Sequence, residues 1–129
     1  MRYRQANRET FFRLISDLDQ RLKSFAMAAI RIADSWPRCM GASVLGRQFL
    51  RSATSVGAHY REARRARSDA EFVAKLEVGI QELDAAVYWC DLLGESGYVP
   101  LETMKEVRRE VDELLGILVS IVKKVKGRS

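Results

Sequence analysis

Arginines dominate the one stretch of this sequence whose residue types indicate ligand binding, residues 47–67. The stretch carries six arginines and a single acidic residue, Glu62, a surplus of five positive charges that equals the net charge of the whole chain. The planar guanidinium group matches phosphate oxygens, and several in a row give salt-dependent, sequence-independent affinity for a polyanion. The six are Arg47, Arg51, Arg61, Arg64, Arg65 and Arg67.

These arginines have a second reading, as a solvated helix face or as ion pairs with acids of the next helix or of neighbouring subunits. Arg51 and Arg61 fit structural pairing better. Arg64, Arg65 and Arg67, near the expected end of a helix, are the better candidates for a polyanion contact. Basic residues also close the chain and suit the negative pole of a helix. We therefore expect two groups in a nucleic-acid site: Arg47, Arg61, Arg64, Arg65 and Arg67, and Lys123, Lys124 and Lys126.

Glu62 is the lone acid among the arginines, and Lys75 is a lone base in an acidic segment. Residues of opposite charge placed in this way often pair. We expect a buried or half-buried network of Arg51, Glu62, Lys75 and Glu82. Such networks fix helix register more surely than they add stability.

No catalytic or metal constellation is visible. Glu62 as a general acid or base would need a substrate pocket and a second titrating group. His59 and Glu62 share a helix face, but a di-iron bundle needs more than the one histidine present here. Cys90 falls on an apolar stripe and Cys39 in a loop without an obvious base, so neither indicates a nucleophile. The sequence predicts no enzyme, no metal site and no cofactor.

Three aromatic residues, Tyr88, Trp89 and Tyr98, fall at and after the end of an expected helix. Aromatic rings beside basic residues can stack nucleic-acid bases. Packing at a bundle end or at a subunit interface is the favoured reading, because tyrosine and tryptophan are enriched there.

Four amphipathic helices must position these residues. Each shows apolar residues at steps of three and four, which is typical of helices packed lengthwise at a shallow angle. Asn7 and Trp36-Pro37 bound the first helix, and Ser43 or Val44 begins a second that ends near Arg65. Ser68-Asp69-Ala70-Glu71 is a capping box for the third, and Pro100 suits the first turn of the fourth. The apolar stripes are Phe11, Ile15, Leu18, Leu22, Phe25, Ala29, Ile32 and Trp36; Leu45, Phe49, Ala53, Val56, Tyr60 and Ala63; Phe72, Leu76, Ile80, Leu83, Val87 and Cys90; and Met104, Val107, Val111, Leu114, Leu118, Ile121 and Val125.

The expected fold is therefore an all-α, antiparallel up-down-up-down four-helix bundle, with residues 1–129 as a single domain. Apolar residues make up 47% of the chain and charged residues 30%, which is typical of a soluble globular protein. No apolar run approaches the roughly 20 residues that span a membrane, and no signal peptide is expected. Two cysteines without metal or redox spacing indicate a reducing, cytoplasmic setting. Apolar residues off the main stripes, such as Phe12, Ile30 and Ile117, indicate oligomerisation.

The middle of the chain resembles a known family. The matching residues are Gln48, Leu50-Arg51-Ser52-Ala53, Ser55-Val56-Gly57-Ala58, Tyr60-Arg61-Glu62-Ala63, Ala66, Ser68, Phe72, Lys75-Leu76, Glu82 and Tyr88-Trp89. In them the chain resembles the four-helix-bundle family encoded in intervening sequences of bacterial 23S rRNA genes. That family is similar to the accessory variability determinant of diversity-generating retroelements. The resemblance is dense over residues 44–93 and is a hydrophobic pattern elsewhere. One residue departs from it: His59 stands where the family usually has asparagine.

The resemblance implies a cytosolic homo-oligomer, a pentameric ring of bundles, with a basic surface suited to RNA or DNA; it implies no reaction. Two hypotheses follow. The first is a nucleic-acid-binding accessory protein that acts beside a reverse transcriptase, ribosomal RNA or another protein. The second is a self-assembling scaffold whose arginines form inter-subunit ion pairs. Phosphate binding weakens steeply with salt, whereas apolar assembly does not, so the salt response distinguishes them.

Overall fold

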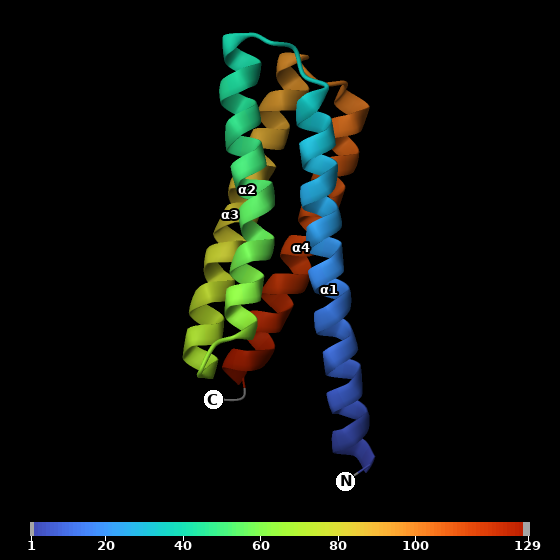
Figure 1. The fold of residues 1–129 in the computed structure, drawn as a ribbon, viewed down its shortest axis with the longest axis vertical. Coiled ribbons are helices and arrows are strands. Elements are labelled where there is room, and N and C mark those ends of the chain that lie inside the picture. The colour runs from blue at the N-terminus through green and yellow to red at the C-terminus, as the bar shows by residue number, and fades with distance from the viewer. Residues whose placement is uncertain (1, 128–129) are drawn as a thin grey trace.

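The structure is a computed structural model that describes the backbone of residues 2–127 and the side chains of residues 13–127. It confirms the predicted antiparallel four-helix bundle, and no strand occurs in the described backbone. Successive helices run up and down the bundle (Figure 1). The helices are α1 (Arg2–Asp34), α2 (Met40–Arg64), α3 (Asp69–Ser96) and α4 (Leu101–Gly127).

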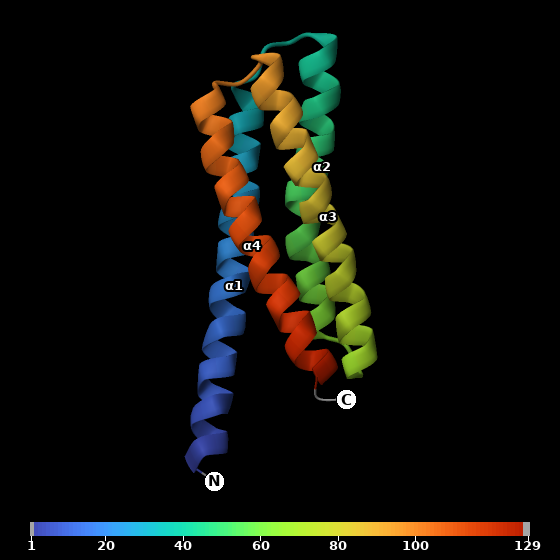
Figure 2. The same cartoon turned by 180° about the vertical axis from the view of Figure 1, so that it is seen from behind.

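The four helices form two layers, with α1 and α2 on one side of the molecule and α3 and α4 on the other (Figures 1 and 2). Extensive packing joins only helices that are consecutive in the described chain: α1 with α2, α2 with α3, and α3 with α4. The seam between α1 and α4 is bridged by Arg21, which forms ion pairs with Glu110 (2.7 Å) and Glu113. The first turns of α1 project beyond the other helices (Figure 2).

The ends of α3 follow local sequence signals. Ser68 is the N-cap, and its Oγ accepts a hydrogen bond of 3.1 Å from the backbone N–H of Glu71. The Glu71 carboxylate accepts from the N–H of Arg67 at 3.1 Å, one residue earlier than in a standard capping box. At the other end Gly97 has a φ of +80°, a left-handed conformation that favours glycine and stops the helix.

Two helix starts differ from the prediction. The second helix begins at Met40, three to four residues before the predicted start, and its N-cap, Cys39, makes no side-chain capping bond. A cap without a polar bond leaves no signal in the sequence. The predicted cap at Asn7 is also wrong, because α1 already begins at Arg2.

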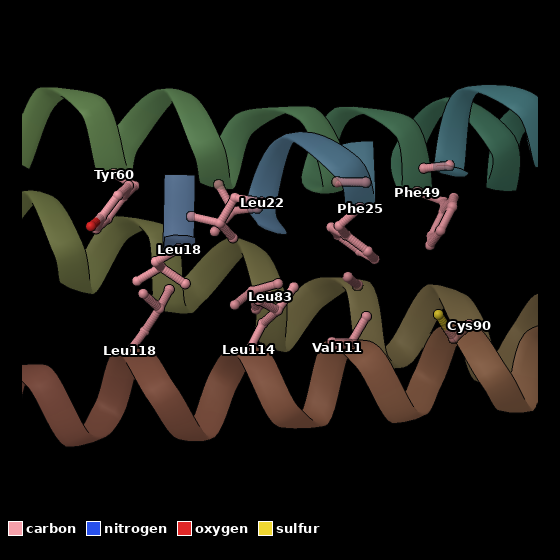
Figure 3. Packing of buried hydrophobic residues seen from close by; sticks show 14 of the residues in the cluster. Leu18, Leu22, Phe25, Phe49, Tyr60, Leu83, Cys90, Val111, Leu114 and Leu118 are labelled. Carbon is pink, nitrogen blue, oxygen red and sulfur yellow. The ribbon is translucent and has the colours of Figure 1, made fainter. Parts of the chain in front are cut away.

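The core fills the space between the two layers (Figure 3), and most of the predicted stripe residues lie in it or pack against it. The side chain of Phe11 lies outside the described residues. Near one end Phe49 packs between Phe25 and Trp36, with ring centroids 6.5 Å and 5.9 Å away. Trp36 in turn lies against Gly46, where an added Cβ would come within 2.4 Å of the indole ring.

No helix within residues 2–127 is long and apolar enough to span a bilayer.

Candidate nucleic-acid interface

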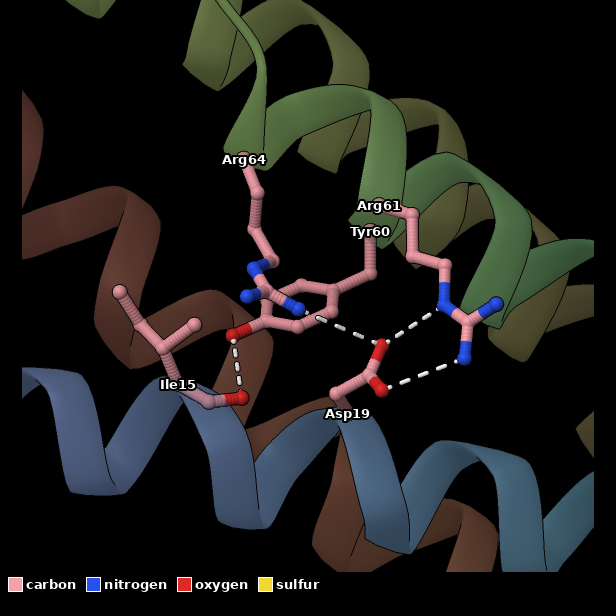
Figure 4. A network of polar contacts seen from close by, with 5 residues as sticks. All are labelled: Ile15, Asp19, Tyr60, Arg61 and Arg64. Carbon is pink, nitrogen blue, oxygen red and sulfur yellow. Dashed lines mark hydrogen bonds and ion pairs between the residues drawn. The ribbon is translucent and has the colours of Figure 1, made fainter.

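Two of the predicted phosphate-binding arginines are tied to the first helix by one carboxylate, Asp19 (Figure 4). Arg61 binds it with both ends of its guanidinium fork, Nε to Oδ1 at 2.9 Å and Nη2 to Oδ2 at 3.3 Å. Arg64 approaches Oδ1 at 3.6 Å, and its guanidinium carbon lies 6.0 Å from the ring centroid of Tyr60. Asp19 therefore neutralises much of the charge that Arg61 and Arg64 would otherwise offer to a ligand.

Asp19 is a residue that the sequence reasoning missed. The hydrogen bond from Arg61 holds the pKa of its carboxyl below the usual value, so Asp19 is ionised at neutral pH. Its only signal in the sequence is its place, one residue after Leu18 on the core stripe of α1. Beneath it the hydroxyl of Tyr60 donates a 3.1 Å hydrogen bond to the backbone oxygen of Ile15.

Four other predicted residues, near the ends of α2 and α4, are exposed and form no ion pair with any described acid: Arg65, Arg67, Lys123 and Lys124. Arg65 caps the end of α2, and the backbone of Arg67 is held by Glu71. The lysines lie on the last turns of α4, at the same end of the bundle (Figure 1). We call this group, together with the partly paired Arg64, the basic end.

One contact joins the two predicted groups of cations at this end. Lys126 pairs with Glu77 on α3 at 3.0 Å, which places the end of α4 against the start of α3 and so close to the turn that carries Arg67. The bundle thus brings two separate sequence segments to one site. Lys126 itself is engaged by this acid.

Arg47 lies apart from the basic end. It is exposed on the outer side of α2, one turn before Arg51, which is exposed too. Arg47 and Arg65 are 18 residues apart, a distance of about 27 Å along the helix axis at 1.5 Å per residue. The six arginines therefore do not form one continuous patch.

Of the four residues expected in a structural network, the structure brings two together. Lys75 Nζ lies 3.3 Å from Glu62 Oε2, and both side chains are about half exposed rather than buried. His59 Nδ1 is 3.8 Å from the same oxygen. Arg51 and Glu82 form no ion pair within the described side chains.

The remaining candidate groups are a buried cysteine and a possible metal site. Cys90 is buried, and burial raises the pKa of its thiol to about 12, which keeps it protonated at neutral pH. It borders a hollow of about 620 Å³ between α3 and α4, which is lined also by Arg108 and Asp112 but not by Glu62. Among residues 13–127, no three His, Cys, Asp or Glu side chains are grouped to hold a metal ion.

The aromatic residues divide between the surface and the bundle end. Tyr88 is 58% exposed and packs against Trp89, with ring centroids 5.3 Å apart. Tyr98 is partly buried and lies against Gly41, so it closes the end of the bundle opposite the basic end. Tyr88 is thus the aromatic ring on an open surface, at a distance along α3 from the basic end.

A search of solved structures finds a similar protein from Bacteroides thetaiotaomicron VPI-5482, described as a protein with unknown function from the S23 ribosomal protein family. It is 29% identical, aligns over 84% of this chain and 97% of its own, and has a TM-score of 0.79. No curated protein matches the sequence. The family model of the 23S rRNA-intervening sequence protein matches residues 16–120. The chain therefore belongs to the 23S rRNA-intervening sequence protein family.

Proposed function

We propose that this chain is a non-enzymatic, cytosolic, homo-oligomeric accessory protein that binds RNA or DNA through the basic end of its bundle. The observation that carries the proposal is the meeting, at one end, of Arg65, Arg67, Lys123 and Lys124, exposed and without ion pairs to described acids. Unpaired cations on a rigid scaffold release condensed counterions when they meet phosphates, which is the main source of sequence-independent affinity.

The positions of the other predicted cations refine this proposal. Arg61 and Lys126 contribute less, because Asp19 and Glu77 hold them at 2.9 Å and 3.0 Å. Arg64 is intermediate, since its 3.6 Å contact with Asp19 leaves its side chain 40% exposed. Arg47 lies farther from the basic end along α2. It extends the site only for a nucleic-acid strand that runs along that helix.

The names of the similar proteins favour RNA as the first probe. The family is described by a 23S rRNA intervening sequence, and the neighbour by an S23 ribosomal protein family. A pentameric ring, a reverse-transcriptase partner and a DNA ligand are further parts of the proposal that rest on the resemblance alone.

The test compares two triple variants that lower the net charge from +5 by the same amount. One, R65Q/R67Q/K123Q, removes charge at the basic end. The matched control, R38Q/K105Q/R109Q, removes charge at the other end of the bundle. A fluorescent, structured RNA and a duplex DNA of equal length are titrated at several salt concentrations, with circular dichroism as the folding control.

The basic-end variant should lose most of its affinity, and its log–log salt slope should fall by about 2 to 3, because three phosphate contacts are removed. The control should bind nearly as the parent does. Equal losses in both variants would mean that net charge and not this site drives binding. If the protein binds neither the RNA nor the DNA, the nucleic-acid proposal is wrong and the scaffold hypothesis remains, in which the arginines pair between subunits.

A further inference from the structure

The outer side of α3 carries a second apolar stripe that the bundle does not use. Its residues recur at steps of four, three, four and three, the spacing of a helix seam, and none is charged. Val78 is 37% exposed and Tyr88 58% exposed. A helix facing only solvent normally carries charges on that side. We call this set the α3 stripe: Ala74, Val78, Gln81, Ala85 and Tyr88.

The outer side of α1 carries a comparable set of residues, one of which is positively charged. Gln20, Lys23, Met27 and Ile30 are all exposed and follow the same three-and-four spacing. Met27 is 41% exposed and Ile30 38% exposed. This set is called the α1 stripe, and Arg31 lies exposed beside it.

The two stripes lie in layers of opposite charge. In the α1–α2 layer, residues 13–67 carry 11 Lys and Arg against 4 Asp and Glu. In the α3–α4 layer, residues 68–127 carry 7 against 12. Asp84 is exposed beside Ala85, and Glu82, which is partly buried, adjoins Gln81 at the centre of the α3 stripe. One layer is therefore electrostatically complementary to the other layer of a second copy.

The stripes also match in direction and height. Both α1 and α3 run from the basic end toward the opposite end (Figure 1). Leu22 of α1 lies 3.7 Å from the Cβ position of Gly57, and the neighbouring Val56 lies 3.6 Å from the Cβ position of Gly79 on α3. Leu22 and Gly79 are thus at one level. Because each helix rises 1.5 Å per residue, Met27 is level with Asp84, and Ile30 is level with Val87, next to Tyr88.

From this match we infer that copies of the chain associate head to tail, with the α1 stripe of one copy packed in parallel on the α3 stripe of the next. Met27 and Ile30 then cover Ala85 and Tyr88, and Lys23 and Arg31 lie on either side of Asp84. The contact uses two different surfaces of each copy, so repeated contacts close into a ring or continue as a filament. The inference rests on the homo-oligomeric part of the proposed function and specifies its interface.

Disulfide crosslinking tests the contact in the full chain. Cys39 is first replaced by serine, and Cys90 is retained because its buried thiol, with a pKa of about 12, does not react. The double variant M27C/A85C is then oxidised at low concentration. Head-to-tail packing should give a ladder of linked copies that ends at the size of the closed assembly. The control pair T54C/R109C, at exposed positions of α2 and α4, should give no ladder.

The single variant M27C separates this contact from a symmetric one. A contact of α1 with α1 would link M27C alone into dimers and no further, and that result would overturn the inference. A monomer at micromolar concentration in light scattering would overturn it as well. If the α3 stripe bound a different protein and not a second copy of the chain, the inference would also be overturned.

Charge reversal gives an independent readout. K23E/R31E should weaken self-association at least about tenfold, and adding D84K should restore part of it. The control R38E/R109E changes the net charge equally and should assemble normally. None of these residues belongs to the basic end. A crosslinked ladder without RNA binding would therefore contradict the proposed nucleic-acid site alone. RNA binding without a ladder would contradict this interface alone.

Discussion

Tyr60 joins two helices at the level of a single residue. Its ring is buried in the core, its hydroxyl donates to the backbone oxygen of Ile15, and the guanidinium of Arg64 lies over its face. Burial raises its pKa to about 12, since the phenolate is poorly solvated there. A group with a raised pKa in the folded state stabilises the fold below its unfolded pKa and loses that effect as pH rises.

The replacement Tyr60→Phe should therefore act in two ways. At neutral pH the loss of the hydrogen bond should lower the free energy of unfolding by about 1 kcal/mol. Between pH 10 and pH 12 the parent should lose stability as the unfolded tyrosine ionises, and the variant should lose less. Urea unfolding at pH 7, 9 and 11 measures both effects. The exposed Tyr88→Phe is the control, and an identical alkaline slope in Y60F and Y88F would contradict the assignment.

Asp19 sets how much positive charge the end of α2 presents. Asp19→Asn removes the carboxylate that holds Arg61 and Arg64, at 2.9 Å and 3.6 Å. We expect slightly lower stability and tighter RNA binding with a steeper salt slope, because two guanidinium groups are released. Salt titrations of D19N beside D17N, a change of equal charge at an exposed position of the same helix, measure the effect. Equal slopes in the two variants would show that local pairing is unimportant.

At the scale of the helices, two glycines in similar conformations predict opposite results. Gly46 faces the ring of Trp36, which an added Cβ would approach to 2.4 Å, whereas Gly116 has open space around its Cβ position. Gly116→Ala should raise the free energy of unfolding by about 0.5–1 kcal/mol through helix propensity. Gly46→Ala should lower it by about 1 kcal/mol or more, because displacement of the indole outweighs that gain. Thermal and urea unfolding of the two variants provide the comparison.

Local signals account for the parts of the fold that the sequence predicted. The apolar stripes and the cap at Ser68 depend on neighbours three or four residues away, so they can be recognised in the sequence alone. The start of α2 is not, because Cys39 caps it without a side-chain bond. Two glycines of α2, Gly41 and Gly46, meet side chains that exclude a Cβ, those of Tyr98 and Trp36, whereas Gly57 has ordinary contact with Leu22.

Apart from the contact of Lys75 with Glu62, pairing across helices could not be predicted. Arg61 and Asp19 are 42 residues apart, and their contact depends on which turn of α1 lies opposite the end of α2. The same holds for Arg21, whose acid partner Glu110 is 89 residues away. Periodicity locates the inner face of each helix but not the axial offset between two helices. The sequence therefore located the group of basic residues but did not show which of them are free of an acidic partner and so available to a ligand.

For the whole molecule, the two proposals combine into an expectation about avidity. Parallel, head-to-tail packing would place every basic end on the same rim of the assembly, where one long RNA can contact several copies. The K23E/R31E variant should then bind a long RNA about 10–100-fold more weakly than the parent, although its basic end is intact.

An oligonucleotide too short to reach two copies should bind the variant and the parent nearly equally. Fluorescence anisotropy with both lengths makes the comparison. Equal losses for the long and the short ligand would show that each copy binds alone.

The sparse packing between α1 and α4 has a consequence for how the chain reaches its fold. Since every extensive contact in the described chain joins consecutive helices, each can form by closing one short turn. Proteins dominated by such local contacts fold in microseconds to milliseconds. The long-range bridge from Arg21 to Glu110 and Glu113 is then expected to form late. Its removal should speed unfolding and leave the folding rate almost unchanged.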